Sequence, residues 1–285
     1  MAFSAEAARS AVITKAIPST GERLPAIGLG TDSFRSSERA AIQAEIKRMP
    51  DLGGTVIDTS ADYGDSEQLI GEALQALGIR QRLFIATKLT AGGGFFDRVG
   101  GEASFRRSLQ RLNTPRVDLL QVHNLEGTDS LMPMMQAWKK AGQVRYLGVT
   151  TSVGSQHDDI VQLMRKYPLD FIQVDYSIGN RDAANTVFPI AMERKVAVLA
   201  NLPLGSASLI GQAAARKLPV WAADIGVSSW SQFFLKYVIS HPAVTCAIPG
   251  STKLAHLEDN QGAARGPLPD AAQRRRMEQY WDGLS

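Results

Sequence analysis

The sequence predicts an α/β protein with a (β/α)8 (TIM) barrel, formed by one domain over residues 1–285. Two observations indicate this fold: eight short β-like runs, and an amphipathic segment after most of them. Successive runs begin 25 to 49 residues apart, near the ~30 residues of one βα unit. The eight runs are Ala26–Leu29, Thr55–Asp58, Leu83–Thr87, Asp118–Val122, Val144–Gly148, Phe171–Val174, Val196–Leu199 and Thr245–Ile248.

Most of these runs are continuously apolar rather than alternating, which is typical of parallel strands covered on both faces. No linker divides the chain into halves, so a closed barrel is favoured over a doubly wound sheet. The long interval before the last run predicts an extra helix around Ser228–Ile239.

The connecting segments carry the 3.6-residue period of amphipathic helices. One apolar stripe comprises Ala41, Ile42, Ile46 and Met49, and a second comprises Leu69, Ile70, Ala73, Leu74 and Leu77. Asp65, three residues before Gln68, predicts a capping box at the start of the second helix.

Both ends of the chain have predicted roles. Val12–Ile17 and Arg23–Pro25 flank Ser19-Thr20-Gly21 and predict a hairpin that closes the bottom of the barrel. Residues 1–11 are expected to be disordered, and they lack the apolar region of a signal peptide. The stripe of Met277, Tyr280, Trp281 and Leu284 predicts a docked C-terminal helix.

Charge and composition limit the classes of binding partner that we expect for this protein. The net charge is only +3, from 31 basic and 28 acidic residues, so no nucleic-acid partner is expected. The basic run Arg274–Arg276 is expected on a solvated helix face. No stretch approaches the ~20 apolar residues of a membrane span. We expect a cytoplasmic protein, a removed export signal being the alternative, that is a monomer or weak oligomer.

Metal and disulfide chemistry are not expected. Cys246 is the single cysteine, which excludes an intrachain disulfide, and its apolar surroundings predict a buried structural thiol. The four histidines, at positions 123, 157, 241 and 256, show no ligand spacing.

Reactive side chains follow three successive predicted strands. Asp58 ends the second strand and Tyr63 follows it, Lys88 ends the third, and His123 ends the fourth. In a barrel these strand ends meet at one rim, where active sites form. Alone, each side chain is more often a cap, a solvated cation or a satisfied polar residue, so the convergence carries the prediction.

Together these groups have a chemical logic. A lysine ammonium stabilises a phenolate, so Lys88 is expected to lower the pKa of Tyr63 and make it a better proton donor. Asp58 would hold Lys88 charged, and His123 would position a carbonyl oxygen against Tyr63. None of these side chains supplies a hydride, so an organic cofactor is required.

The pattern resembles the Asp/Tyr/Lys/His tetrad of the aldo-keto reductases, in Asp58-Thr59, Tyr63-Gly64, Lys88 and Leu120–His123. The resemblance covers almost the whole chain. It extends to Gly28–Thr31, Val144–Val149, Ile248–Lys253 and Glu258–Asn260. It implies reduction of aldehydes or ketones with NADPH, with NADH as a second option, and Tyr63 as proton donor.

The resemblance also implies the cofactor contacts. Gln173, Thr150 and Thr151 would hold the nicotinamide carboxamide, Leu202–Ser206 would cover the pyrophosphate, and Ser251, Thr252 and Lys253 would meet the 2′-phosphate. Asp259 and Asn260 would face the adenosine. The further contacts implied by position are Gly30, Thr31, Asp58, Asn201, Leu202, Leu204, Gly205, Ser206, Ile248, Gly250 and His256.

Several positions depart from the family pattern. Thr150-Thr151 replaces the Ser-Asn pair of many members, and Asn201 replaces a tyrosine that stacks on the nicotinamide. His256 stands where an arginine is frequent near the adenine, and Gly250 where a lysine is frequent. The fold and the tetrad are untouched, but the preference for NADPH over NADH is expected to be weaker.

The substrate is expected to be a small carbonyl compound. The loop after His123 is short, which predicts an open pocket, with Phe34, Phe95, Phe96 and Trp221 as candidate lining residues. Two other functions remain open. A non-catalytic nicotinamide-nucleotide-binding barrel would not need both Tyr63 and Lys88, and a barrel hydrolase or isomerase would need a metal cluster or paired carboxylates at the rim.

Overall fold

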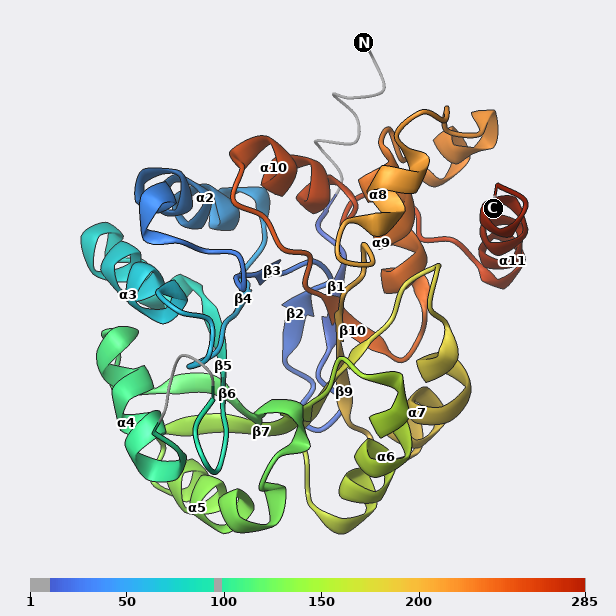
Figure 1. The fold of residues 1–285 in the computed structure, drawn as a ribbon. Helices are drawn as coiled ribbons and strands as arrows, with labels where there is room; N and C mark the ends of the chain where they lie inside the picture. The colour runs from blue at the N-terminus through green and yellow to red at the C-terminus, as the bar shows by residue number, and fades with distance from the viewer. Residues whose placement is uncertain (1–10, 95–98, 285) are drawn as a thin grey trace.

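The structure, a computed structural model, describes residues 11–94 and 99–284. Its centre is a sheet of eight parallel strands in the order β10-β9-β8-β7-β6-β5-β4-β3, curled into a ring in Figure 1. The strands are β3 (Leu29–Gly30), β4 (Val56–Asp58), β5 (Phe84–Leu89), β6 (Val117–Val122), β7 (Val144–Thr150), β8 (Phe171–Asp175), β9 (Ala197–Asn201) and β10 (Val244–Ala247).

Two parallel bridges close the ring between its first and last strands. They join Ile27 to Ala247 and Gly30 to Gly250. Backbone hydrogen bonds from Gly28 N to Ala247 O (2.8 Å) and from Gly30 N to Pro249 O (2.9 Å) support the same seam. The predicted (β/α)8 barrel is therefore confirmed, although regular pairing of the first strand begins only at Leu29.

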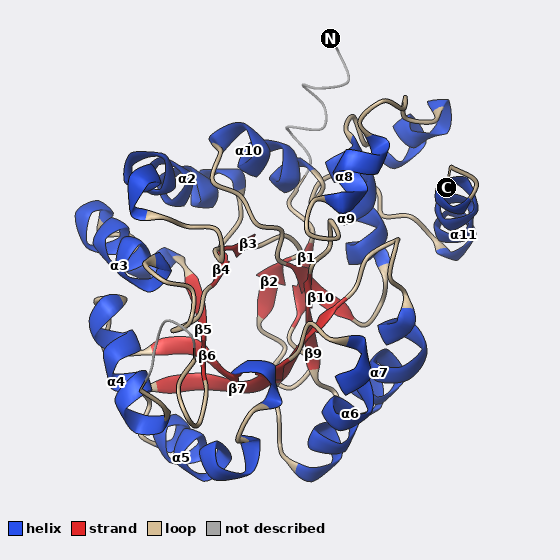
Figure 2. Ribbon diagram, viewed as in Figure 1, coloured by secondary structure: helices blue, strands red, loops and turns tan. Residues whose placement is uncertain are grey.

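Helices surround the strands on the outside (Figure 2). They are α2 (Arg39–Leu52), α3 (Ser66–Leu77), α4 (Gly101–Arg111), α5 (Thr128–Lys140), α6 (His157–Lys166), α7 (Asp182–Glu193), α8 (Ser208–Ala213), α9 (Trp230–Ser240), α10 (Leu254–Gly262) and α11 (Ala271–Asp282). Short 3₁₀ turns cover Ser36–Glu38, Arg80–Arg82, His123–Leu125, Gly154–Gln156 and Val220–Ile225. Helix α9 is the predicted extra helix before the last strand.

Apolar side chains fill two layers. The larger cluster lies between the strands and the helices, and includes Ile42, Ile46 and Met49 of α2 and Leu69, Ile70, Ala73 and Leu74 of α3. A smaller cluster comprises Ile17, Leu24, Val56, Phe84, Ala86, Leu119, Tyr146, Phe171, Ala197, Leu199, Cys246 and Ile248. It gathers strand residues from around the ring, which are the side chains that point inside the barrel.

The N-terminal hairpin closes one end of this interior. Strands β1 (Thr14–Ala16) and β2 (Arg23–Pro25) pair antiparallel. Ile17, directly after β1, and Leu24, within β2, are fully or almost fully buried in the inner cluster. The predicted hairpin plug is thus confirmed. The hairpin leaves the opposite end of the barrel, where the strands have their carboxyl ends, uncovered.

Close helix packing explains one glycine. A Cβ added to Gly71 in α3 would lie 1.9 Å from the carbonyl oxygen of Arg111 at the end of α4. Only glycine permits this approach of backbone to backbone. The two helices behind the Tyr63 and Lys88 loops are thereby held close together.

Three local predictions were wrong in whole or in part. The Asp65 side chain makes no hydrogen bond to the first turn of α3; it accepts one from Ser36 instead. Ala41 is exposed, and the buried face of α2 includes Glu45 beside Ile42, Ile46 and Met49. In the basic run, Arg275 and Arg276 are exposed as predicted, but Arg274 is half-buried, and its guanidinium donates to Tyr176 Oη at 2.7 Å and to Ser240 Oγ at 2.6 Å.

The C-terminal helix docks as its stripe predicts, since Met277 and Trp281 are buried. Cys246 is also buried, as expected. In the part of the chain that the structure describes, no helix is long and apolar enough to cross a membrane.

Candidate active site

The open end of the barrel holds a cavity of about 690 Å³, within the range of small-molecule and cofactor sites. Strand register explains what meets there. Asp58 is the last residue of β4, Lys88 pairs with Gln121 across β5 and β6, and His123 directly follows β6. Because the strands are parallel, their carboxyl ends reach the same rim.

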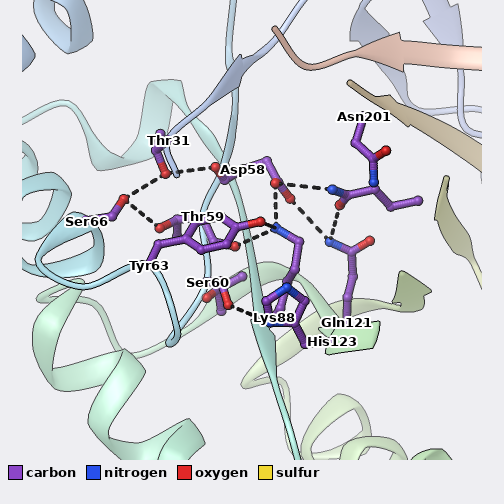
Figure 3. Close-up of polar contacts among 12 residues, drawn as sticks. Thr31, Asp58, Thr59, Ser60, Tyr63, Ser66, Lys88, Gln121, His123 and Asn201 are labelled. Atoms are coloured by element: carbon purple, nitrogen blue, oxygen red, sulfur yellow. Dashed lines mark hydrogen bonds and ion pairs between the residues drawn. The ribbon is translucent and has the colours of Figure 1, made fainter. Parts of the chain in front are cut away.

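The Lys88 ammonium is the centre of the polar network (Figure 3). Its Nζ donates to Asp58 Oδ2 at 2.5 Å, to Thr59 O at 2.9 Å and to Tyr63 Oη at 3.3 Å. An ammonium has three hydrogens, and these three acceptors use them all. Tyr63 Oη therefore accepts from Lys88, and its own hydrogen is left to point elsewhere.

Asp58 is held by three side chains. Besides Lys88, Gln121 Nε2 donates to its Oδ1 at 3.3 Å and Gln173 Nε2 to its Oδ2 at 3.4 Å. Gln121 Nε2 also donates to Gln173 Oε1 at 3.0 Å. Thr31 Oγ1 donates to the backbone carbonyl of Asp58 at 2.9 Å. The carboxylate is thus fixed in a buried position beneath the cavity.

Burial sets the direction of the pKa of each phenol and carboxyl group. Burial raises the pKa of Tyr63 above its usual value of 10.0, and the charge of Lys88 only partly offsets this. The expected lowering is therefore wrong as a net effect, because desolvation of the phenolate exceeds the attraction of Lys88. Burial likewise raises the pKa of Asp58, against the opposing effect of Lys88.

The pKa values of the two nitrogen bases, Lys88 and His123, are shifted in opposite directions. Burial disfavours the charged form of Lys88, but Asp58 and Tyr63 outweigh it, so the pKa of Lys88 is raised. Burial and the positive charge of Lys88 lower the pKa of His123 to about 3. At neutral pH the site thus combines a protonated phenol, an ammonium and an uncharged imidazole.

Tyr63 and His123 are neighbours, with ring centroids 5.7 Å apart and ring planes at 79°. Both line the cavity, whereas Lys88 lies behind Tyr63 with only 1% of its surface exposed. His123 Nδ1 lies 3.2 Å from Ser60 Oγ. A carbonyl oxygen in the cavity can therefore reach a phenol and an imidazole at once.

Most residues of the predicted cofactor set lie on this cavity. The structure brings together Gly30, Thr31, Asp58, Thr150, Gln173, Asn201, Leu202, Leu204, Ser206, Ile248, Gly250, Ser251, Thr252, Lys253 and His256. They come from six strands or the segments directly after them (β3, β4, β7, β8, β9 and β10) and from the start of α10. Leu202 and Ser206 adopt left-handed backbone with φ of 47° and 52°, so their loop has a defined shape rather than an extended one.

Four other predicted cofactor residues do not line the cavity. Gly205 lies within the loop whose neighbours do, and Thr151 is fully buried. Asp259 accepts from Ser229 Oγ at 2.6 Å and from Gln232 Nε2 at 2.8 Å, both at the start of α9, and Asn260 is buried. The side chains of Asp259 and Asn260 are thus engaged with the protein itself, and their predicted contact with the adenosine stays a prediction.

Of the predicted substrate-pocket residues, Phe34 and Trp221 do not line the cavity. Phe34 is completely buried in the core. Trp221 packs against Phe233, Tyr280 and the guanidinium of Arg276, in the aromatic cluster under α11. Both placements correct the prediction, because these rings fill hydrophobic packing rather than the cavity. Phe95 and Phe96 lie outside the described residues.

Several lining residues were not predicted from the sequence, namely Asp32, Ser33, Asn124, Ser152, Ala207 and Pro249. Most directly follow a predicted strand or a predicted site residue. The strand-end rule that found Tyr63 and His123 would have included them. Within residues 11–94 and 99–284, no group of three or more potential metal ligands is present.

Comparison with known proteins agrees with this geometry. The model of the aldo/keto reductase family matches residues 26–280. The chain is 30% identical over 263 residues to the methylglyoxal reductase YeaE of Escherichia coli, covering 87% of this chain and 88% of that protein. It is 26% identical over 300 residues to the NADP(+) aldo-keto reductase yakc of Schizosaccharomyces pombe, covering 88% and 86%.

Solved structures show the same architecture. An aldo/keto reductase from Klebsiella pneumoniae in complex with NADP and acetate is 25% identical, with a TM-score of 0.77 over 92% of this chain and 93% of the other. Another solved structure of an aldo-keto reductase from that organism, in complex with NADPH, has a TM-score of 0.79 at 24% identity and covers 95% of this chain and 96% of the other. With the matched family model spanning nearly the whole barrel, this chain belongs to the aldo/keto reductase family.

Proposed function

We propose that this protein reduces small aldehydes or ketones to alcohols with a reduced nicotinamide cofactor, NADPH in preference to NADH, and that Tyr63 delivers the proton. One observation carries the proposal. The three hydrogens of Lys88 Nζ are used by Asp58, Thr59 and Tyr63, so the hydroxyl hydrogen of Tyr63 is available to a substrate in the cavity that Tyr63 lines.

The cavity residues fit a dinucleotide. A Cβ on Gly30 would lie 2.9 Å from the carbonyl oxygen of Ile248, so only glycine permits the close approach of β3 to the segment after β10 at this wall of the cavity. Asn201 lines the cavity, and its buried Oδ1 has no hydrogen-bond partner among the described residues. This unpartnered acceptor supports a hydrogen bond from the nicotinamide carboxamide to Asn201, near Gln173 and Thr150, which line the same cavity.

The far end of the cavity fits a phosphate. Ser251, Thr252 and Lys253 immediately precede α10, whose first turn receives no side-chain hydrogen bond from its N-cap residue Lys253. The amide groups and dipole at a helix start favour an anion, and the Lys253 side chain adds a positive charge. When bound in this cavity, the reduced nicotinamide supplies the hydride.

Side chains of the protein carry out the proton transfer. Tyr63 Oη gives its proton to the carbonyl oxygen as that oxygen gains negative charge, and Lys88 stabilises the resulting phenolate. Asp58 keeps Lys88 charged and in place. His123, uncharged because its pKa is about 3, donates one N–H to the same carbonyl oxygen without competing as an acid.

A direct assay tests the proposal. Purified protein is mixed with NADPH or NADH and a panel of small carbonyl compounds that begins with methylglyoxal, because the E. coli relative is named for it. We expect carbonyl-dependent oxidation of the cofactor, with one alcohol formed per cofactor oxidised. Tight cofactor binding without turnover across the panel would instead support the non-catalytic barrel.

A further inference from the structure

The side chain of Glu45 lies behind the predicted 2′-phosphate position. Helices α2 and α10 pack against each other (Figure 1), and Glu45 of α2 points to the segment that precedes α10. Its residue surface is fully buried. It occupies the same face of α2 as Ile42, Ile46 and Met49, where an apolar residue is expected. A carboxyl group in this place requires a reason.

The contact partner of Glu45 is Ser251. Ser251 Oγ donates to Glu45 Oε1 at 2.7 Å, and lies 3.0 Å from the carbonyl oxygen of Lys253 as a second acceptor. The backbone N–H of Lys253 donates to Ser251 Oγ at 3.1 Å. Ser251 lines the cavity through the 6% of its surface that is exposed.

These contacts decide what Ser251 offers to a ligand. A hydroxyl has one hydrogen and two lone pairs. The hydrogen is directed to Glu45, the shorter contact and the stronger acceptor, and one lone pair is used by the Lys253 N–H. What remains is a lone pair, so Ser251 presents an acceptor to the cavity rather than a donor.

The hydrogen bond from Ser251 holds the carboxyl group of Glu45. Ser251 Oγ donates to Oε1, and Oε2 has no hydrogen-bond partner among the described residues. Burial raises the pKa of Glu45, and the hydrogen bond from Ser251 opposes this shift. In the ionised form Oε1 accepts from Ser251, and a negative charge also lies close to the cavity.

We propose that Glu45 is a specificity-determining residue that makes Ser251 a hydrogen-bond acceptor at the adenosine ribose, and so narrows the preference for NADPH over NADH. The inference rests on the proposed cofactor site. A ribose 2′-hydroxyl donates to the free lone pair of Ser251, whereas a 2′-phosphate faces it with oxygen atoms that have no hydrogen to give. Lys253 supplies the attraction that a phosphate receives. The expectation that Ser251 donates to the 2′-phosphate is thereby replaced.

Replacing Glu45 tests the proposal by binding rather than turnover. In Glu45→Met the Ser251 hydrogen is free to choose between the neutral carbonyl of Lys253 and a charged phosphate, which is the stronger acceptor. Methionine suits the apolar surroundings of this helix face. We expect the ratio of NADPH to NADH affinity, measured by isothermal titration calorimetry, to rise about tenfold. Asp51→Asn is the matched control, because it removes a carboxylate from the exposed end of the same helix and should change the ratio less than about twofold.

A second variant removes the hydroxyl itself. Ser251→Ala should weaken NADH binding more than NADPH binding, because only the 2′-hydroxyl loses a partner. A selective loss of NADPH affinity in Ser251→Ala overturns the inference, as does an unchanged ratio in Glu45→Met. If wild-type protein binds neither cofactor, the proposed function fails instead, so the two failures are distinguishable.

Discussion

Ser60 determines which nitrogen of His123 carries the proton. Ser60 Oγ accepts the backbone N–H of Asp62 at 3.1 Å and lies 3.2 Å from His123 Nδ1. Among residues 11–94 and 99–284, no other acceptor is within reach of its hydrogen, so that hydrogen goes to Nδ1. Because a pKa of about 3 keeps the imidazole uncharged, its single N–H is on Nε2.

We therefore expect Ser60→Ala to lower kcat/KM for carbonyl reduction by about tenfold, since a positioning hydrogen bond is worth about 1 kcal/mol or slightly more. The dissociation constant of NADPH should not change. Nitrogen-15 NMR of labelled histidine gives the decisive readout. The His123 signals should report the Nε2–H tautomer in wild type and a mixture of tautomers in Ser60→Ala. A single unchanged tautomer would contradict the assignment.

Tyr63→Phe removes the proposed proton donor and little else. The ring stays in its edge contact with His123, and Lys88 keeps Asp58 and Thr59 as acceptors. We expect turnover to fall about 10²–10⁴-fold, with cofactor affinity within about twofold of wild type. Steady-state kinetics and a cofactor titration on the same preparation check both parts. Near wild-type turnover would end the proposed mechanism.

Lys88→Met should act through Tyr63. Lys88 is the group whose charge lowers the pKa of the buried phenol, so without it that pKa rises further and the phenolate left after proton transfer is less stable. We expect turnover to fall at least about 10²-fold, with a changed pH profile of the residual activity. If rate and pH profile both match wild type, Lys88 takes no part in the chemistry.

The fold and the tetrad could be predicted because both depend on local pattern and chain order. Continuous apolar runs mark parallel strands, and parallel strands bring Asp58, Lys88 and His123 to one rim without knowledge of any side-chain contact. The same logic failed for the net pKa of Tyr63. The phenol's burial depends on residues from many strands, and its sequence neighbours do not report it.

Contacts between segments far apart in the sequence could not be predicted from the sequence alone. Glu45 and Ser251 are 206 residues apart, and nothing in either segment shows that α2 and α10 meet. Trp221 was predicted to line the pocket, but it packs against Phe233 and Tyr280. Arg274 is half-buried because Tyr176 and Ser240 offer it acceptors.

A buried lysine away from the site predicts how stability changes with pH. Lys236 is fully buried, and its Nζ donates to the carbonyl oxygens of Arg265 (2.5 Å) and Pro267 (2.7 Å). Burial lowers the pKa of Lys236 from 10.5 to about 8. Between these two values the unfolded chain binds more protons than the folded protein, so the free energy of unfolding rises with pH in that window.

The measurement compares wild type with Lys236→Met in urea unfolding between pH 7.5 and 9.5. The difference in unfolding free energy, wild type minus variant, should become more favourable to wild type as pH rises past about 8. Across the measured range the difference should grow by about 2 kcal/mol. A difference that is flat with pH would show that Lys236 keeps an ordinary pKa in the folded protein.

Lys253 is an exposed residue of the proposed cofactor site. It stands at the N-cap of α10 and lines the cavity, where the usual arginine is replaced by His256. We expect Lys253→Ala to weaken NADPH binding about tenfold and NADH binding less than about twofold, near the lower limit for a charge-assisted contact because solvent screens an exposed ammonium. Raising the salt concentration should shrink the NADPH preference of wild type but not of the variant. Dissociation constants for both cofactors at two ionic strengths check this. Equal wild-type affinities, or an equal loss for both cofactors in Lys253→Ala, would place the 2′-phosphate elsewhere on the rim.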